Sequence, residues 1–351
     1  MSLEVRELEA HDAAAWDRFV ATQSGANLYH TNAWRGVVEE IFGHRAVYLM
    51  CEEGGEVRGV LPMFLVRFPL LGSKLVSIPY DIGSGGPLAV DAEVERQLAT
   101  RAIDLARAHA VDYLELRCGS ARPSLEGLGL VRSEPVVISD VELDDRDQVW
   151  SRVARDHRKA VRKAEKRGVE LVEAQTEADF SSFYEIYLRV FRDFGTPPYG
   201  KRYFPTLWKR LHANGHVRLL LARSGSDDVG GLVMFCFGDQ LVSKFAACLP
   251  EAVSLRVYPA LYWRAMELGL ESGCRRLSWG TSSRSQSGLI EFKERWGAHH
   301  RPAVLYDLPV RGKVPSLERY YDSDGLARVV WRKLPLPVTS LLGAGLSRWF
   351  C

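Results

Sequence analysis

The feature that most constrains this chain is one order of elements that occurs twice: helix, β-hairpin, helix and strand. In the first copy, hydrophobic periodicity predicts helices over 11–22, 31–41 and 93–109, the last followed by the strand DYLELR. The second copy begins with the strand VELVEA, followed by a helix ending at Gly195, a second hairpin, and a helix and strand within 258–280. An internal duplication explains this order. A chain of 351 residues is long enough for two hydrophobic cores.

The two predicted hairpins match each other in position and pattern. HRAVYLMCEEGGEVRGVLPMFLV and HVRLLLARSGSDDVGGLVMFCFG each place apolar runs on both sides of a polar turn. Between the copies lies DDRDQVWSRVARDHRKAVRKAEKRG, which has a helical pattern over about 150–167. We therefore predict one domain over 1–144, a second over 145–330, and an amphipathic C-terminal segment over 331–351.

Composition narrows the class of protein. The chain has 46 basic and 44 acidic residues, a net charge of +2, so contact with nucleic acid would be local, and DNA binding is not expected. The N-terminus lacks a basic start followed by an apolar stretch, and the sequence has no uninterrupted apolar run of about 18 residues. These patterns predict a cytoplasmic protein. HExxH, G-x-S-x-G and Walker motifs are absent from the sequence, which predicts neither a metal nor a tightly bound cofactor.

The strongest local motif is SWGTSSRSQSGLIEFKERWGAH, over 278–299. A strand enters a loop of small and hydroxyl residues and continues into a short helix. Backbone N–H groups in such a loop, and at the helix N-terminus, favour a negatively charged ligand. A surface loop before a solvated basic helix is the alternative. Substrate contacts are predicted for Ser283, Arg284, Ser285 and Gly288.

A central hairpin, a helix and one further strand form the core order of the GNAT fold, in which acyl donor and acceptor meet at splayed strands. We therefore predict an α/β (α+β) protein of two tandem GNAT-like domains, with mixed sheets flanked by helices and a cleft between the domains. Two segments carry a resemblance to a known family: GCRRLSWGTSSRSQSGLIEFKERWG and ARDHRKAVRKAEKRGVEL. Shorter matches that support it are FGHRAVYLM, GVLPMF, SIPYDIGSGG, FGTPPYGKRYF and WRKLPLPVTSLLG. The chain resembles the FemAB family of tandem-GNAT transferases, which add amino acids from aminoacyl-tRNA to peptidoglycan precursors. It looks most like the branch associated with exopolysaccharide and exosortase loci.

The resemblance implies a catalytic role for the pair Phe292-Lys293. The Lys293 ammonium would stabilise negative charge near the reacting carbonyl or the phosphate end of the donor. A surface lysine on the polar face of a helix is the alternative. In the first half, Asp81 is the one carboxylate expected at the cleft, and we nominate it as the base. Trp34 and Tyr80 are expected in loops that face the same cleft.

Two further segments are candidate binding sites. Tyr199 and Lys201, in FGTPPYGKRYF, are expected to line the acceptor site, unless this segment is an ordinary helix connection. Arg155, Arg158 and Arg162 share one face of the predicted linker helix, which suits a diphosphate or an RNA backbone. A solvated linker helix is the alternative.

The sequence leaves the acyl donor open. Neither half has the Q/R-x-x-G-x-G/A turn that grips the pyrophosphate of CoA, and the stretch 201–215 is too short for the helical hairpin of cell-wall FemAB ligases. The donor is therefore aminoacyl-tRNA, acyl-CoA or acyl-carrier protein. The predicted function is transfer of an aminoacyl or acyl group to an amine of a peptidoglycan or polysaccharide precursor. The alternatives are an N-acyltransferase that uses acyl-CoA or acyl-carrier protein, and a non-catalytic envelope-assembly protein.

The C-terminal segment WRKLPLPVTSLLGAGLSRWF has an amphipathic pattern. It is too short and too interrupted by proline and glycine to span a bilayer. Two placements are open: the segment lies in the interface at the inner face of the membrane, or its apolar face packs on one of the domains. The apolar residues that recur at three- and four-residue steps are Leu334, Val338, Leu341, Leu342, Leu346 and Trp349.

Overall fold

The computed structural model describes residues 2–68, 72–83, 85–315 and 326–349. These residues form two compact units. The first contains 2–138 and 301–315, and the second contains 139–300 and 326–349. Each unit is therefore discontinuous in sequence, whereas the predicted boundaries at 144/145 and 330/331 divide the chain into consecutive domains.

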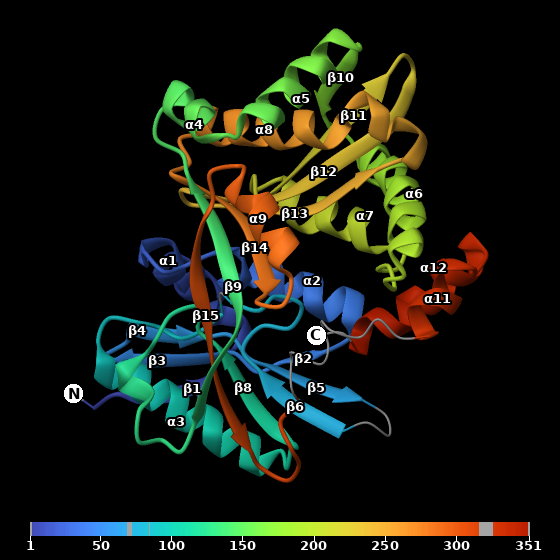
Figure 1. The fold of residues 1–351 in the computed structure, drawn as a ribbon. Helices are drawn as coiled ribbons and strands as arrows, with labels where there is room; N and C mark the ends of the chain where they lie inside the picture. Colours follow the sequence, from blue (N-terminus) through green and yellow to red (C-terminus); the bar gives the residue numbers. More distant parts are fainter. Residues whose placement is uncertain (1, 69–71, 84, 316–325, 350–351) are drawn as a thin grey trace. The chain divides into compact units, whose positions relative to one another are not determined.

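The first unit contains two sets of strands. In one sheet the order is β1-β3-β4-β7, and the other strands of the unit follow the order β15-β8-β6-β5-β2. Helix α3 packs against β3 and β4 (Figure 1). The elements are β1 (Glu4–Glu7), η1 (Ala10–Asp12), α1 (Ala13–Thr22), η2 (Leu28–His30), α2 (Asn32–Phe42), β2 (Arg45–Ala46), β3 (Leu49–Glu53), β4 (Glu56–Leu61), β5 (Phe64–Phe68), β6 (Gly72–Val76), β7 (Leu88–Ala89), α3 (Ala92–Ala108), β8 (Tyr113–Arg117), η3 (Pro123–Leu125), the start of β9 (Val131–Glu142) and the end of β15 (His299–Pro309).

Local sequence signals set several of these boundaries. The Thr31 side chain accepts a hydrogen bond from the Trp34 N–H and caps α2, and Gly43 ends this helix with a φ of 68°. Gly54 and Gly55 both have positive φ, as the two-residue turn of the β3–β4 hairpin requires. The helix predicted over 31–41 and the predicted first hairpin are confirmed.

The second unit is a sheet with helices on both faces. Its strands follow the order β10-β11-β12-β13-β14, and they pair antiparallel except for the parallel pair β13–β14. The elements are α4 (Arg146–Arg152), α5 (Arg155–Lys166), β10 (Val169–Glu173), α6 (Glu177–Phe194), α7 (Tyr203–Leu207), the π-helical turn η4 (Trp208–His212), β11 (Val217–Ser224), β12 (Asp227–Phe237), β13 (Gln240–Cys248), η5 (Pro250–Leu255), α8 (Val257–Glu271), β14 (Arg276–Ser283), α9 (Ser287–Glu294), α11 (Leu326–Arg332), α12 (Leu336–Leu346) and η6 (Ser347–Trp349).

The predicted linker helix over 150–167 is wrong as a single helix. It is broken between α4 and α5, where Val153 is extended and its side chain is fully buried. The N–H of Ala154 donates to the Arg295 carbonyl at 2.7 Å instead of continuing the helix. Burial of one valine and a hydrogen bond to a distant residue therefore override the helical pattern.

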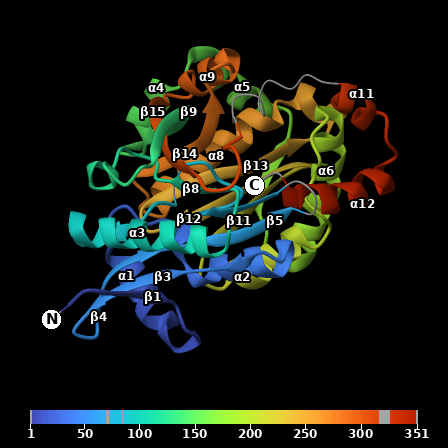
Figure 2. The same ribbon diagram turned by 90° about the horizontal axis from the view of Figure 1, so that it is seen from below.

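Two adjacent glycines let helices approach both faces of β12. A Cβ built on Gly230 would lie 2.7 Å from Val257 of α8, and one built on Gly231 would lie 2.6 Å from Phe183 of α6. Successive residues of a strand face opposite sides of a sheet. The pair therefore sets the spacing of the helix layers, with α5 and α8 on one face and α6 on the other (Figures 1 and 2).

We expect Gly230→Ala and Gly231→Ala each to lower the free energy of unfolding by about 1–3 kcal/mol, because the added methyl overpacks a filled layer. Urea denaturation measures the change. Gly345→Ala is the matched control, since a Cβ there meets no atom within 4 Å. An unchanged unfolding midpoint for both strand variants would show that the helix layers can accommodate an added methyl group.

Candidate functional site

Strands β13 and β14 diverge in the middle of the second unit. They pair over Gln240–Val242 and Arg276–Ser278, although both strands run on beyond this ladder. A bulge accompanies the divergence: Met234 of β12 pairs with Ser243 and Val233 with Phe245, so Lys244 is an extra residue in β13. Two strand edges that separate in this way present backbone groups to an extended ligand.

Lys293 lies beside the end of β14. Its side chain is 4% exposed, and its Nζ donates to Ser282 Oγ at 2.8 Å and to the carbonyls of Gly280 and Thr281, both at 3.3 Å. These three acceptors match the three protons of an ammonium group. Burial lowers the pKa of Lys293 to about 8. The alternative of a surface lysine is therefore wrong.

Three further polar residues of the second unit, Asp140, Ser139 and His300, were not among the predicted site residues. Asp140 is 1% exposed, and its negative charge opposes the fall in the Lys293 pKa. The neighbouring Ser139 Oγ lies 3.0 Å from Nδ1 of His300, and His300 Nε2 lies 3.4 Å from Oε1 of Glu294 in α9. The sequence does contain a signal for this pair of buried residues, since Ser139 and Asp140 are two polar residues within the apolar run VVISDV.

The loop after β14 satisfies much of its own hydrogen bonding. The N–H of Ser283 donates to Gln286 Oε1 at 3.1 Å, and the N–H of Ser285 donates to Ser283 Oγ at 3.3 Å. These two groups are thus engaged inside the loop rather than presented to an anion. Arg284 and Gly288 are exposed, and a Cβ on Gly288 would meet no atom within 4 Å.

Phe292 belongs to an aromatic cluster that anchors α9. Its ring centroid lies 5.9 Å from that of Tyr262, 6.3 Å from that of Trp279 and 5.5 Å from that of His157. His157 also stacks on Trp296 at 4.7 Å, and burial lowers the pKa of this histidine. The structure thus gives Phe292 a packing role that holds Lys293 in place.

Tyr199 packs against β13 beyond the bulge. Its ring lies 4.3 Å from that of Tyr203 and 5.7 Å from that of Phe245, the residue after Lys244. Its backbone N–H donates to the Tyr187 hydroxyl at 3.0 Å. The segment FGTPPYGKRYF is therefore brought to the diverging part of β13, while the side chain of Lys201 is exposed.

Helix α5 carries positive charge that no described residue neutralises. Arg155, Arg158, Lys159, Lys163 and Lys166 form no ion pair within the described part of the chain. The remaining arginine of the helix, Arg162, lies over the Trp150 ring at 5.7 Å. Just after the helix, the Arg167 guanidinium donates to the Ser254 carbonyl in η5. The cationic helix thus ends beside the turn that precedes α8.

In the first unit the corresponding parallel strands are closed by their own chain. β6 and β8 pair over Lys74–Val76 and Tyr113–Glu115, and the ladder continues as Ser77 N–H donates to the Glu115 carbonyl and Gly85 N–H to the Arg117 carbonyl. A Cβ on Gly85 would lie 2.1 Å from Ile78. This loop therefore continues the β6–β8 ladder, whereas the β13–β14 ladder ends after three residue pairs.

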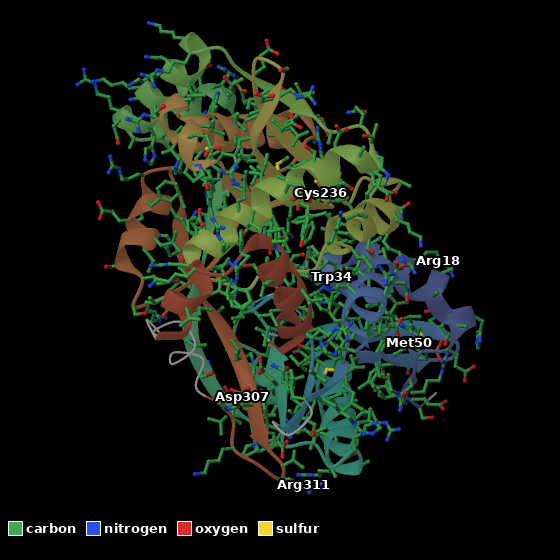
Figure 3. The ribbon with its side chains drawn as sticks, turned by 90° about the vertical axis from the view of Figure 1, so that its right-hand side faces the viewer. Arg18, Trp34, Met50, Cys236, Asp307 and Arg311 are labelled. Carbon is green, nitrogen blue, oxygen red and sulfur yellow. The ribbon has the colours of Figure 1, made fainter. Side chains whose placement is uncertain are left out.

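Tyr80 and Asp81 lie together in that loop. Tyr80 has a φ of 71°, which is rare for an aromatic residue, and its hydroxyl is 2.6 Å from His44 Nε2. The Asp81 carbonyl accepts a hydrogen bond from Arg117 Nη1 at 2.5 Å. Trp34, labelled in Figure 3, does not lie in a loop as expected: it belongs to α2, is 1% exposed and packs edge-on against Tyr29.

A buried charge cluster supports the loop. Glu115 lies 3.6 Å from Lys74 Nζ and in contact with Arg117 Nε. Burial alone would raise the pKa of Glu115, but the positive charges of Arg117 and Lys74 lower it. Asp307 of β15 lies opposite Glu115 (Figure 3). Burial and the negative charge of Glu115 raise the pKa of Asp307 to about 7.

Thiol and metal chemistry have little support among the described residues. Burial raises the pKa values of Cys118, Cys236 and Cys248 to about 12, so their thiolates are scarce at neutral pH. Within the described ranges, no group of three or more His, Cys, Asp or Glu side chains is arranged to hold a metal ion.

Comparison with known proteins agrees with this geometry. Residues 151–296 match the family described as acetyltransferase (GNAT) domain. The chain is similar to the crystal structure of FemX, with 16% identity, a TM-score of 0.73, and coverage of 88% of this chain and 98% of that one. It is also similar to a domain described as that of a lysylphosphatidylglycerol synthetase from Agrobacterium fabrum (12% identity, TM-score 0.56, coverage 85% and 91%). A third similar structure is a tandem GNAT protein from the clavulanic acid biosynthesis pathway (14% identity, TM-score 0.55, coverage 90% and 100%). No curated protein matches the sequence.

The domain match and the diverging strands define the class: the chain is an acyltransferase with a GNAT domain. In fold it is a FemAB-like tandem GNAT protein, as the sequence predicted. Among the described residues, no helix is long and apolar enough to cross a membrane.

We expect burial of Lys293 to make stability depend on pH. The folded-state pKa is about 8 and that of an unfolded lysine is about 10.4, so between these values the unfolded state binds more protons. The stability of the wild type therefore rises with pH in this window relative to Lys293→Met, by more than about 1 kcal/mol. Urea denaturation of both proteins at about pH 7 and pH 9.5 measures the difference. Parallel behaviour of the two proteins would contradict a buried ammonium.

Proposed function

We propose that this protein transfers an aminoacyl or acyl group from an activated carrier to an amine of a cell-envelope precursor. The observation that carries the proposal is the divergence of β13 and β14 beside the buried ammonium of Lys293. The amine nitrogen would attack the donor carbonyl, forming a C–N bond as the C–O or C–S bond to the carrier breaks. The proton lost by the amine would pass to the leaving oxygen or sulfur.

Lys293 would act in two ways. Its three hydrogen bonds fix the backbone of Gly280 to Ser282 at the end of β14, which positions the loop that follows. Its charge lies in a buried site, where it would stabilise negative charge developing on the attacked carbonyl more strongly than in water. Asp81 belongs to the first unit and Lys293 to the second, so the proposal names no base, and the attacking amine needs none if it is already neutral.

Two features of the second unit support our choice of donor. After β13, the 3-10 helix Pro250–Leu255 and Arg256, with a φ of 69°, stand where enzymes that use CoA carry a glycine-rich turn. Beside this turn lies α5, with six cations that make no ion pair among the described residues. These features favour a donor that carries a polyanionic body, namely aminoacyl-tRNA or acyl-carrier protein, over acyl-CoA.

The acceptor and the location are part of the same proposal. One similar structure is FemX, and another is described as a lysylphosphatidylglycerol synthetase, a name that implies a lipid acceptor. We propose a peptidoglycan or exopolysaccharide precursor as acceptor, and a cytoplasmic enzyme that works at the inner face of the membrane. The amine of that precursor would approach along the Tyr199 and Lys201 segment.

We expect Lys293→Ala to abolish transfer, because the variant loses both the charge and the three hydrogen bonds to the loop. The assay incubates the protein separately with charged tRNA, acyl-CoA and acyl-carrier protein and follows consumption of each donor. Lys313→Ala, an exposed lysine of the first unit, is the control. Near-normal turnover by Lys293→Ala would remove this lysine from the site. Binding of a donor without turnover by the wild type would instead support an envelope-assembly protein.

The pH profile separates charge from simple packing. Because the pKa of Lys293 is about 8, we expect the rate in the wild type to fall as pH rises through this value, when the ammonium loses its proton. Lys293→Arg stays charged over this range, so its lower rate would show no such fall. An identical profile in both proteins would assign the fall to another group.

We expect Arg158→Glu to raise the KM for the donor about tenfold at low salt, with little change in kcat, because reversing one charge on α5 weakens attraction for a polyanion. Arg18→Glu, an exposed arginine of the first unit, is the matched control (Figure 3). Steady-state kinetics at low and high salt measure both variants. An equal effect of the two substitutions would argue that only net charge matters.

A further inference from the structure

The C-terminal helix α12 packs on the second unit through its small residues. Thr339, Gly343 and Ser347 are buried at four-residue steps, which places them on one face of the helix and of the turn that follows it. A Cβ built on Gly343 would lie 2.6 Å from the Pro198 carbonyl oxygen, so the helix meets this backbone directly. Figures 1 and 2 show α11 and α12 beside α6.

Further contacts fix α12 in this orientation. Tyr184 of α6 and Ser340 share a hydrogen bond of 2.7 Å between their hydroxyls. A Cβ on Gly200 would lie 2.8 Å from Ala344, so the connection between α6 and α7 also touches the helix. The segment therefore packs on a domain, which is one of the two predicted placements, but α12 does so through small and hydroxyl residues and not through its apolar face.

Several large apolar side chains of the segment are left in solvent, although Trp331 is buried. Leu341 is 76% exposed, and its neighbours on the same side of α12 are exposed as well. Adjoining apolar side chains of this size are uncommon on the free surface of a soluble protein. We call this set the α11–α12 apolar face; its members are Val329, Val330, Val338, Leu341, Leu342 and Leu346.

Within the segment 326–349 the charges have one sign. Between residues 326 and 349 the chain has four basic residues and no acidic residue. Arg332, Lys333 and Arg348 are exposed, and so are Lys201 and Arg202, which follow the glycine that touches Ala344. A second copy of the chain would bring like charges together around the apolar contact, whereas an anionic lipid surface would be attracted by them.

We propose that the α11–α12 apolar face docks on a bilayer that contains anionic lipid. The exposed leucines and valines enter the boundary between headgroups and acyl chains, and the surrounding lysine and arginine side chains contact lipid phosphates. The helix stays packed on α6 throughout, because the face that it uses for packing is separate from the face that it offers to lipid. This inference concerns the surface alone and does not depend on acyl transfer.

Vesicle flotation of the full chain tests the inference. We expect binding to vesicles of phosphatidylcholine with phosphatidylglycerol, weaker binding to phosphatidylcholine alone, and loss of the difference at high salt. Leu341→Glu is expected to reduce binding to the anionic vesicles about tenfold or more, since it removes an inserted side chain and adds a repelled charge. Val131→Glu is the control, because it introduces the same charge at an exposed apolar residue of the first unit. This variant should bind as the wild type does.

Point variants are preferable to truncation, because removing α11 and α12 would uncover the surface of α6 and the 195–200 segment. Thermal unfolding should show Leu341→Glu as stable as the wild type, since the side chain is exposed. Equal vesicle binding by the wild type and Leu341→Glu would overturn the proposal. Dimerisation of the wild type in the absence of vesicles, if Leu341→Glu abolishes it, would also overturn the proposal. That result would assign the face to a second copy of the chain. Donor turnover with a soluble amine is expected to be unchanged in this variant, so failure of either proposal can be told from failure of the other.

Discussion

The candidate site of the second unit depends on the hydrogen bonds that the buried Lys293 ammonium donates to the end of β14. A lysine that is removed from water needs acceptors for all its protons, and here the end of β14 supplies them. In return, the lysine fixes the backbone at the point where β14 leaves β13. The aromatic cluster of Phe292, Tyr262 and Trp279 holds α9 so that this geometry is maintained.

The two units use related strand arrangements in opposite ways. In the first, the loop after β6 returns between the parallel strands, and a buried cluster of Lys74, Glu115 and Arg117 holds it there. In the second, the bulge at Lys244 bends β13 away from β14, and the ladder ends. At this point the two units thus differ by one loop and one extra residue.

The C-terminal helices show how residue size decides which face of a helix is buried. Small residues allow the backbone of α12 to approach Pro198 and Gly200 closely, and a leucine in their place would prevent it. The large side chains therefore remain outside. A pattern of apolar residues at three- and four-residue steps identifies an amphipathic helix but does not say which side faces the protein.

The sequence by itself determined the order of elements, the capped ends of α2 and α6, the two glycine-containing hairpins, and the resemblance to tandem GNAT transferases. These features depend on residues that are close together in the chain. The tertiary structure decided that Lys293 is buried and that Val153 breaks the linker helix. It also brought Ser139 and His300 together across 161 positions. Burial and hydrogen bonding of this kind depend on contacts between distant segments, which no local pattern encodes.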